Sequence, residues 1–210
     1  MEKKYKKYFD KAREIYQDEK SGHDFSHIER VISSCKEILK ETDCDEEVVI
    51  VSALFHDLHR VLSNKEGRFI SAEEAMPYVR EVISGLDLTD DVRNRVLYVI
   101  QEHDNKKYRG EKPIELQIVQ DADILDSLGQ VGLSRTLTYC KRYDIPLVDK
   151  NFMLDCEEYI PDVNPISTLH YIWRTMIPNY DLLHTDKAKK MGRGLVDELK
   201  KFVEENINNS

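Results

Sequence analysis

The chain has 210 residues, of which 40% are hydrophobic and 34% charged, and its formal net charge is −9. This composition excludes a disordered chain, and the negative charge disfavours broad binding to nucleic acid or to an anionic membrane surface. No apolar run approaches membrane-spanning length, the first residues lack the apolar core of a signal peptide, and the four cysteines show no CxxC spacing, so we expect a reduced, cytoplasmic protein without a membrane partner.

Glycine and proline are few, with 8 and 6 residues, which favours an all-α fold. The apolar spacing predicts an amphipathic helix over residues 2–19 and a second helix that begins near Asp24 or Ser26 and ends near Thr42. His27 lies four residues before the apolar stripe of the second helix, so we expect it to point inward. The expected inner faces are Tyr5, Phe9, Ala12 and Ile15 on the first helix, and Val31, Ile32, Cys35, Ile38 and Leu39 on the second.

The longest apolar block covers residues 47–60 and follows an acidic stretch that suits a helix N-terminus. Residues 49–51 alone could form a strand, but the length of the block favours a buried helix that reaches about Leu62. The block ends in His56 and Asp57. Burying an imidazole and a carboxylate costs several kcal/mol unless they are paired, hydrogen-bonded or bound to a cation.

Further helices are expected along the rest of the chain. A capping box at Ser71 opens a helix that Pro77 is expected to kink and Gly85 to end. Thr89 opens another helix, and His103 extends its inner face by one turn. The apolar residues of that face are Val92, Val96, Val99 and Ile100.

A helix from Ile114 to near Gly129 carries Asp121 and Asp123 in an otherwise apolar stretch. There is no internal repeat and no long linker, so we expect a single globular domain with a core from about residue 20 to residue 130. The remaining expected elements are a helix over 130–143 and an ordered loop over 144–164 with Pro146 and Pro161. Two C-terminal helices, over 165–177 and 185–206, are expected to pack on the core, so that about residues 165–206 form its C-terminal cover.

Three separated places supply four ligand-type side chains that the apolar pattern turns inward. They are His27, His56, Asp57 and one aspartate of the pair Asp121 and Asp123. Two imidazoles and two carboxylates form a mixed nitrogen and oxygen donor set that suits one divalent transition metal ion, namely Mn, Fe, Co, Ni or Zn. Each member also has an ordinary alternative, because His27 can be a hydrogen-bonded core histidine and either aspartate a cap or a surface group.

The order of His27, His56-Asp57 and Asp123 resembles the HD superfamily of metal-dependent phosphohydrolases. Three motifs carry the resemblance: His-Asp-x-x-His-x-x-Arg-Val, an apolar Leu-x-His-Asp, and a third motif whose Ala-Asp supplies the final metal ligand. Two C-terminal segments resemble those of a bacterial subgroup often described as nucleotide-hydrolysing. The matching segments are Gly22–Val31, Ala53–Asp57, Val119–Gly129, Ser167–Tyr171 and Leu183–Thr185, so the resemblance spans roughly residues 20–205.

The resemblance implies an HD-domain helical bundle that hydrolyses a phosphoester or phosphoanhydride of a nucleotide or similar small phosphorylated molecule, using water activated by the ion. It assigns the metal to Asp123, which the periodicity leaves open, and leaves Asp121 as a positioning group. His103 could contact phosphate, protonate the leaving oxygen or add a ligand for a second ion. Many relatives carry an acidic residue where this chain has His59 and Arg60. Either His59 takes the acid–base role, or another group does, or the activity is altered.

Several further residues are candidates for contact with the substrate, and Arg30 leads them because the family motif includes it. His23 is expected either to orient His27 or to cap the helix start. The candidate phosphate contacts and pocket-lining residues are Arg30, Arg60, Lys65, Lys106 or Lys107, His23, His170 and His184.

Three alternatives stay open on the sequence. One is a phosphodiesterase acting on cyclic or linear nucleotides, another is a non-catalytic sensor that binds metal and nucleotide, and the last is an HD-type oxygenase, which needs a second iron. The apolar segment 171–173 could pack internally or against a second copy of the chain in a homodimer.

Overall fold

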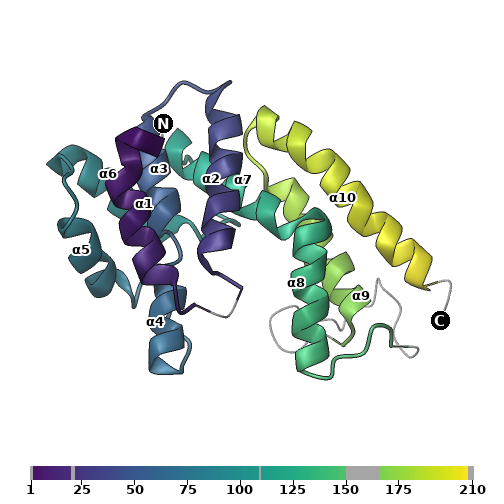
Figure 1. Cartoon of the computed structure of the whole chain (residues 1–210). Coiled ribbons are helices and arrows are strands. Elements are labelled where there is room, and N and C mark those ends of the chain that lie inside the picture. The colour runs from purple at the N-terminus through teal and green to yellow at the C-terminus, as the bar shows by residue number, and fades with distance from the viewer. Residues whose placement is uncertain (1, 20–21, 109, 150–165, 208–210) are drawn as a thin grey trace. The chain divides into compact units, whose positions relative to one another are not determined.

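The computed structural model describes residues 2–19, 22–108, 110–149 and 166–207. Every regular element in these ranges is helical, which confirms the expected all-α fold (Figure 1). The chain forms two compact units, residues 1–122 and 123–210, and the boundary between them falls inside helix α7 (Ile114–Ser127). The expectation of one domain that spans the chain stays a prediction.

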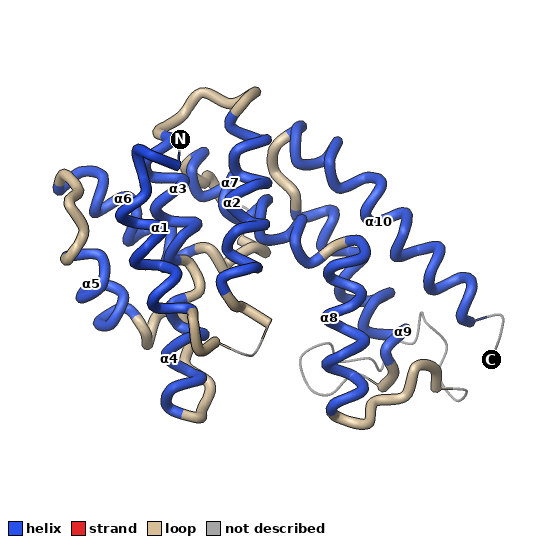
Figure 2. The backbone as a smooth tube through the Cα atoms, in the orientation of Figure 1, coloured by secondary structure: helices blue, strands red, loops and turns tan. Residues whose placement is uncertain are grey.

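The first unit is organised around helix α3. Every residue of α3 from Val48 to Phe55 is buried, so the helix is apolar on all sides. It packs against α1, α2 and α6, while α5 packs on α4 and α6 (Figures 1 and 2). A helix without a polar face needs such cover on every side. The helices of this unit before α7 are α1 (Glu2–Tyr16), α2 (Phe25–Leu39), α3 (Glu46–Phe55), α4 (Leu58–Glu66), α5 (Met76–Ser84) and α6 (Asp90–Glu102).

The buried face of α1 differs from the expected one. Phe9 and Ile15 are only half-buried, and the buried residues are Tyr5, Tyr8, Ala12 and Tyr16. The tyrosines bury their rings and still find polar partners, because the Tyr5 hydroxyl donates to Glu46 Oε1 at 2.9 Å and the Tyr8 hydroxyl donates to the carbonyl oxygen of Asp87 at 2.7 Å. The spacing of purely apolar residues does not reveal this face of α1, because tyrosine has a polar hydroxyl and is not counted among them.

The expected helix over residues 47–62 is wrong, because the chain breaks at the His-Asp pair. Helix α3 ends at Phe55 and α4 begins at Leu58. Asp57 lies between them with φ −92° and ψ 19°, outside helical geometry. No glycine or proline marks the break, so the apolar pattern runs through it. The strand considered for residues 49–51 does not form, since these residues belong to α3.

Two other helix boundaries also differ from expectation. Pro77 does not kink a helix but lies in the first turn of α5, where the missing N–H of proline costs nothing. Ser71 caps the turn that precedes α5 and not the helix itself, since its Oγ accepts from the Glu74 N–H at 3.1 Å. Helix α2 ends at Leu39, three residues before Thr42. Of the two residues expected to cap its start, Asp24 does so, because its side chain accepts from the His27 N–H.

The second unit contains α8 (Gly129–Arg142), α9 (Thr168–Tyr171), a π-helix η1 (Ile172–Met176), a 3-10 helix η2 (Ile177–Leu182) and α10 (Asp186–Ile207). Helix α10 packs on α8, η1 and η2. The helix expected over 165–177 is therefore regular α-helix only as far as Tyr171. The expected loop from residue 150 onward, with Pro161, lies outside the described residues.

Asp45 supports the start of the central helix. Its side chain accepts from the N–H groups of Glu47 and Val48, at 3.0 and 3.4 Å, and from Arg95 Nη1 at 2.9 Å. We expect Asp45→Ala to lower the free energy of unfolding by about 1–2 kcal/mol in urea titrations. Asp45→Asn keeps the capping oxygen and loses only a partly exposed ion pair, so we expect a loss of about 0–1 kcal/mol. Equal losses for the two variants would show that the cap contributes nothing.

Candidate metal centre

Asp57 lies at the junction between α3 and α4 and is 3% exposed. Its Oδ2 atom lies 3.3 Å from His27 Nε2 and 3.4 Å from His56 Nε2, and the two nitrogens are 3.3 Å apart. Donor atoms around an ion with bonds of about 2.0–2.1 Å lie about 3.3 Å apart in tetrahedral geometry and about 3.0 Å apart in octahedral geometry. The triangle of His27, His56 and Asp57 therefore has the dimensions of three ligands on one face of a small divalent cation.

The ring of His56 is held in the orientation that such a ligand needs. Its Nδ1 lies 2.9 Å from the carbonyl oxygen of Ala53, which can only accept, so Nδ1 carries the proton. In the neutral ring, Nε2 then presents its lone pair to His27 and Asp57. Two such nitrogens and a carboxylate oxygen can converge only with a cation or protons between them.

His23 extends the cluster toward the surface. Its Nδ1 lies 2.7 Å from Asp57 Oδ2, and its side chain is 26% exposed. Because a carboxylate only accepts, this contact needs a proton on Nδ1 of His23. His23 therefore orients Asp57, while Asp24 provides the cap of α2. His23, His27 and Asp57 together form one of the groups of side chains that could hold a metal ion.

The other oxygen of Asp57 faces a different pair of imidazoles. Asp57 Oδ1 lies 3.8 Å from His103 Nε2 and 4.0 Å from His59 Nδ1. Asp104 lies beside both rings, with Oδ2 at 3.3 Å from His59 Nε2 and Oδ1 at 3.6 Å from His103 Nε2. Arg60 Nη2 is 3.9 Å from Asp104 Oδ2. Asp57, His59 and His103 form a second group able to hold an ion.

The electrostatics of the cluster keep its carboxylates charged. Burial raises the pKa of Asp57, but the imidazoles of His56, His23 and His103 outweigh burial and hold this pKa well below its usual range. Burial likewise raises the pKa of Asp104, and the neighbouring imidazoles bring it far below its usual range. Burial lowers the pKa of His103, yet the Asp57 and Asp104 carboxylates raise it to a net value above normal. The site therefore combines ionised oxygen donors with imidazole nitrogens.

Helix α7 contributes a side chain that hydrogen-bonds the end of α6. Asp121 is fully buried in the first unit, and Asp123 follows as the first residue of the second unit on the same helix. Gln120 Nε2 donates to the carbonyl oxygens of Glu102 and His103, at 3.0 and 3.1 Å. Gln120 Oε1 in turn accepts from Lys112 Nζ at 2.8 Å. These bonds fix the end of α6, and with it the backbone of His103.

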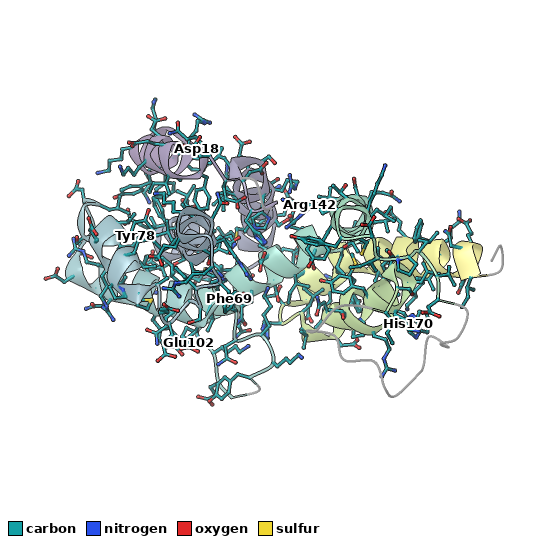
Figure 3. All side chains as sticks on the ribbon, turned by 90° about the horizontal axis from the view of Figure 1, so that it is seen from below. Asp18, Phe69, Tyr78, Glu102, Arg142 and His170 are labelled. Carbon is teal, nitrogen blue, oxygen red and sulfur yellow. The ribbon has the colours of Figure 1, made fainter. Side chains whose placement is uncertain are left out.

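The basic residues expected to contact phosphate lie in different surroundings. Arg30, one turn after His27, donates to Ser26 Oγ at 3.1 Å, whereas Arg60 lies beside Asp104. Lys65 Nζ lies 5.6 Å from the ring centroid of Tyr78 on α5, the residue labelled in Figure 3.

Two expected pocket-lining histidines belong to the second unit. His170 is buried there, with Nδ1 at 2.7 Å from Ser167 Oγ, and His184 is half-buried. The first unit alone brings His23, His59 and His103 to Asp57. The roles expected for His170 and His184 stay predictions.

Two residues near Asp57 escaped the sequence analysis. Asp104 could have been found, because His103-Asp104 repeats the dipeptide His56-Asp57. Tyr16 carried no such signal. Its hydroxyl is buried without a hydrogen-bond partner in the described part of the chain, and burial and the nearby Asp57 charge raise its pKa.

Comparison with known proteins gives a family and a set of structural neighbours. The model of the HD domain matches residues 24–128. An uncharacterized protein of Bacillus subtilis, YpgQ, is 34% identical over 132 residues, which are 61% of this chain and 62% of that protein. The match thus spans less than two thirds of the curated relative. Among the described residues, no helix has the length and apolar character needed to cross a membrane.

Solved structures share the fold over nearly the whole chain. A protein from Lactobacillus plantarum has a TM-score of 0.79 at 19% identity, covering 100% of this chain and 97% of its own. An HD-superfamily hydrolase from Bacillus thuringiensis has a TM-score of 0.75 at 22% identity, covering 99% and 97%. B. subtilis YpgQ in complex with ADP has a TM-score of 0.71 at 21% identity, covering 97% and 95%.

Proposed function

Because this chain belongs to the HD domain family, we propose that it is a metal-dependent phosphohydrolase acting on a nucleotide or a similar small phosphorylated molecule. The observation that carries the proposal is the triangle of His27 Nε2, His56 Nε2 and Asp57 Oδ2, with sides of 3.3–3.4 Å. A mixed set of imidazole and carboxylate donors suits first-row transition ions such as manganese, iron or zinc. The ADP complex of YpgQ supports the nucleotide part of the proposal.

Four residues would hold the ion: His27, His56, Asp57 and Asp123. Asp123 is included because it lies on the continuous helix α7, directly after the last residue of the first unit, and because it matches the Ala-Asp position of the family motif. A bound divalent ion supplies polarisation of a phosphoryl oxygen and a lowered pKa of water. Asp121, buried on the same helix, would act as a positioning group.

The other residues of the cluster act on the geometry and charge around the phosphate. His23 keeps the Asp57 carboxylate in place through the 2.7 Å contact to Oδ2. Negative charge that builds on the phosphoryl oxygens during hydrolysis needs fixed cations nearby. Arg30 and Arg60 are the cations that we propose for this role. Arg60 is held close to Asp104, so its guanidinium is already positioned before substrate binds.

A substrate panel tests the proposal. The purified protein is first freed of metal and then incubated with nucleoside mono-, di- and triphosphates, cyclic nucleotides and sugar phosphates, in the presence of manganese, cobalt, zinc or magnesium. We expect release of phosphate or pyrophosphate, measured by ³¹P NMR, that requires a transition ion. Release by metal-free protein would contradict a metal-dependent reaction. If the protein binds nucleotide but releases no phosphate or pyrophosphate with any of the metals, it is a non-catalytic sensor and not an enzyme.

A further inference from the structure

The connection between α1 and α2 carries a buried carboxylate, that of Glu19, which is only 6% exposed. Its Oε2 atom accepts a hydrogen bond from the backbone N–H of His23 at 3.0 Å. We propose that Glu19 is a positioning residue, which holds the His23 backbone and, through the His23 imidazole, sets the direction of the Asp57 carboxylate. This inference rests on the proposed function, because that function assigns Asp57 to the bound ion.

His23 is the link between Glu19 and the residues proposed to hold the ion. Its Nδ1 lies 2.7 Å from Asp57 Oδ2, the same oxygen that faces His27 and His56. Its ring also lies edge to face against the ring of His27, with centroids 5.4 Å apart and ring planes at 79°. His23 therefore contacts both Asp57 and His27, and a shift of its backbone would move the imidazole relative to both.

The backbone of His23 lies outside the helix that follows it. Asp24 is the N-cap of α2, so His23 precedes the cap and takes no part in the hydrogen bonds of the helix. Gly22, just before His23, has φ of 99°, a conformation that glycine adopts readily and other residues rarely do. Between this glycine and the cap, the bond to Glu19 holds the backbone from which the imidazole projects.

Glu19 is itself anchored at the end of α1. Its N–H donates to the carbonyl oxygen of Tyr16, the last residue of that helix, at 3.1 Å. Burial, and after it the charges of Asp57 and Glu19, raise the pKa of Tyr16, so the Tyr16 hydroxyl lies close to both carboxylates. Helix α1 and Glu19 precede residue 24, where the match to the HD domain begins. The support for His23 therefore comes from outside the matched domain.

Metal affinity tests the inference without recourse to activity. Metal-free protein is titrated with manganese, and the EPR signal of free Mn²⁺ gives the dissociation constant. We expect Glu19→Ala to weaken binding about 10–100-fold, as the loss of a group that orients a metal ligand usually does. Glu19→Gln keeps an acceptor oxygen at the same reach. Because a hydrogen bond to a charged acceptor is about twice as strong as a neutral one, we expect this variant to weaken binding by less than about tenfold.

Glu115→Ala is the matched control. Glu115 is another buried glutamate of the first unit, and its Oε1 accepts from the backbone N–H of Asp45 at 3.3 Å. Asp45 caps the start of α3, whereas Asp57 follows the end of that helix. Glu115→Ala should lower the stability of the protein and keep the manganese affinity of the wild type. Equal losses of affinity in Glu19→Ala and Glu115→Ala would indicate a general loosening of the fold and would overturn the inference.

A double-mutant cycle shows whether Glu19 acts through His23. If it does, Glu19→Ala adds no further loss of manganese affinity to that of His23→Ala. Losses that multiply, or unchanged affinity in Glu19→Ala, would overturn the inference and leave the proposed function standing.

Glu19→Asp decides if Glu19→Ala does not fold. This variant keeps the charge but withdraws the oxygen by one methylene group, so it should bind manganese more weakly than Glu19→Gln does. The reverse order would show that charge, and not the bond to His23, is what matters, and would overturn the inference. A folded wild type that binds neither manganese nor zinc would overturn the proposed function as well.

Discussion

Asp57→Asn is expected to remove the bound transition ion and to lower kcat/KM for the phosphorylated substrate by at least about 10³-fold. The amide keeps the shape of the carboxylate but loses the charge that both sets of imidazoles face. An ion contributes several kcal/mol to the stabilisation of charge in the transition state, and each 1.36 kcal/mol corresponds to a tenfold rate change. Metal content and initial rates, measured on the same preparation, check the expectation.

The matched control is Asp197→Asn, which makes the same chemical change at an exposed position on α10. It should keep both the metal content and the rate of the wild type. Circular dichroism and urea titration show whether Asp57→Asn is folded. A folded Asp57→Asn protein that retains its metal and its turnover would place the reactive centre elsewhere in the chain.

Gly132→Ala is expected to lower the free energy of unfolding by at least about 2 kcal/mol, a fall in Tm of about 4–8 °C. A methyl group at this position would overlap the backbone carbonyl group of Ser127 and would lie 3.2 Å from Met176 Cε. The carbonyl belongs to Ser127, the last residue of α7, and cannot rotate away as a side chain could. The gain in helix propensity from glycine to alanine, about 1 kcal/mol, does not offset this overlap.

A second glycine in the same unit makes the comparison specific. Gly194 lies in α10 with no atom within 4 Å of an added Cβ, so Gly194→Ala should raise the free energy of unfolding by about 0.5–1 kcal/mol. Thermal unfolding of the two variants therefore shifts in opposite directions. A Gly132→Ala protein as stable as Gly194→Ala would contradict the close approach of the Ser127 carbonyl group.

The presence of most helices and several of their ends could be predicted from local sequence signals, whereas the break between α3 and α4 could not. Asp24, Thr89 and Gly85 mark helix ends because a side-chain acceptor or a flexible backbone acts within its own turn. The break at Asp57 has no such signal. At this break the Asp57 side chain contacts His23 and His103, which lie tens of residues away in the sequence.

The sequence by itself determined the all-α class, the apolar centre at residues 47–60 and the order of ligand-type residues that marks the family, because composition, helical period and motif spacing are local properties of a chain. The tertiary structure alone decided which imidazole faces which oxygen of Asp57. It placed His59 and His103 on Oδ1 and brought Asp104 beside them. Such directions depend on the angles at which separate helices pack and on where α3 stops. No spacing along one segment encodes them.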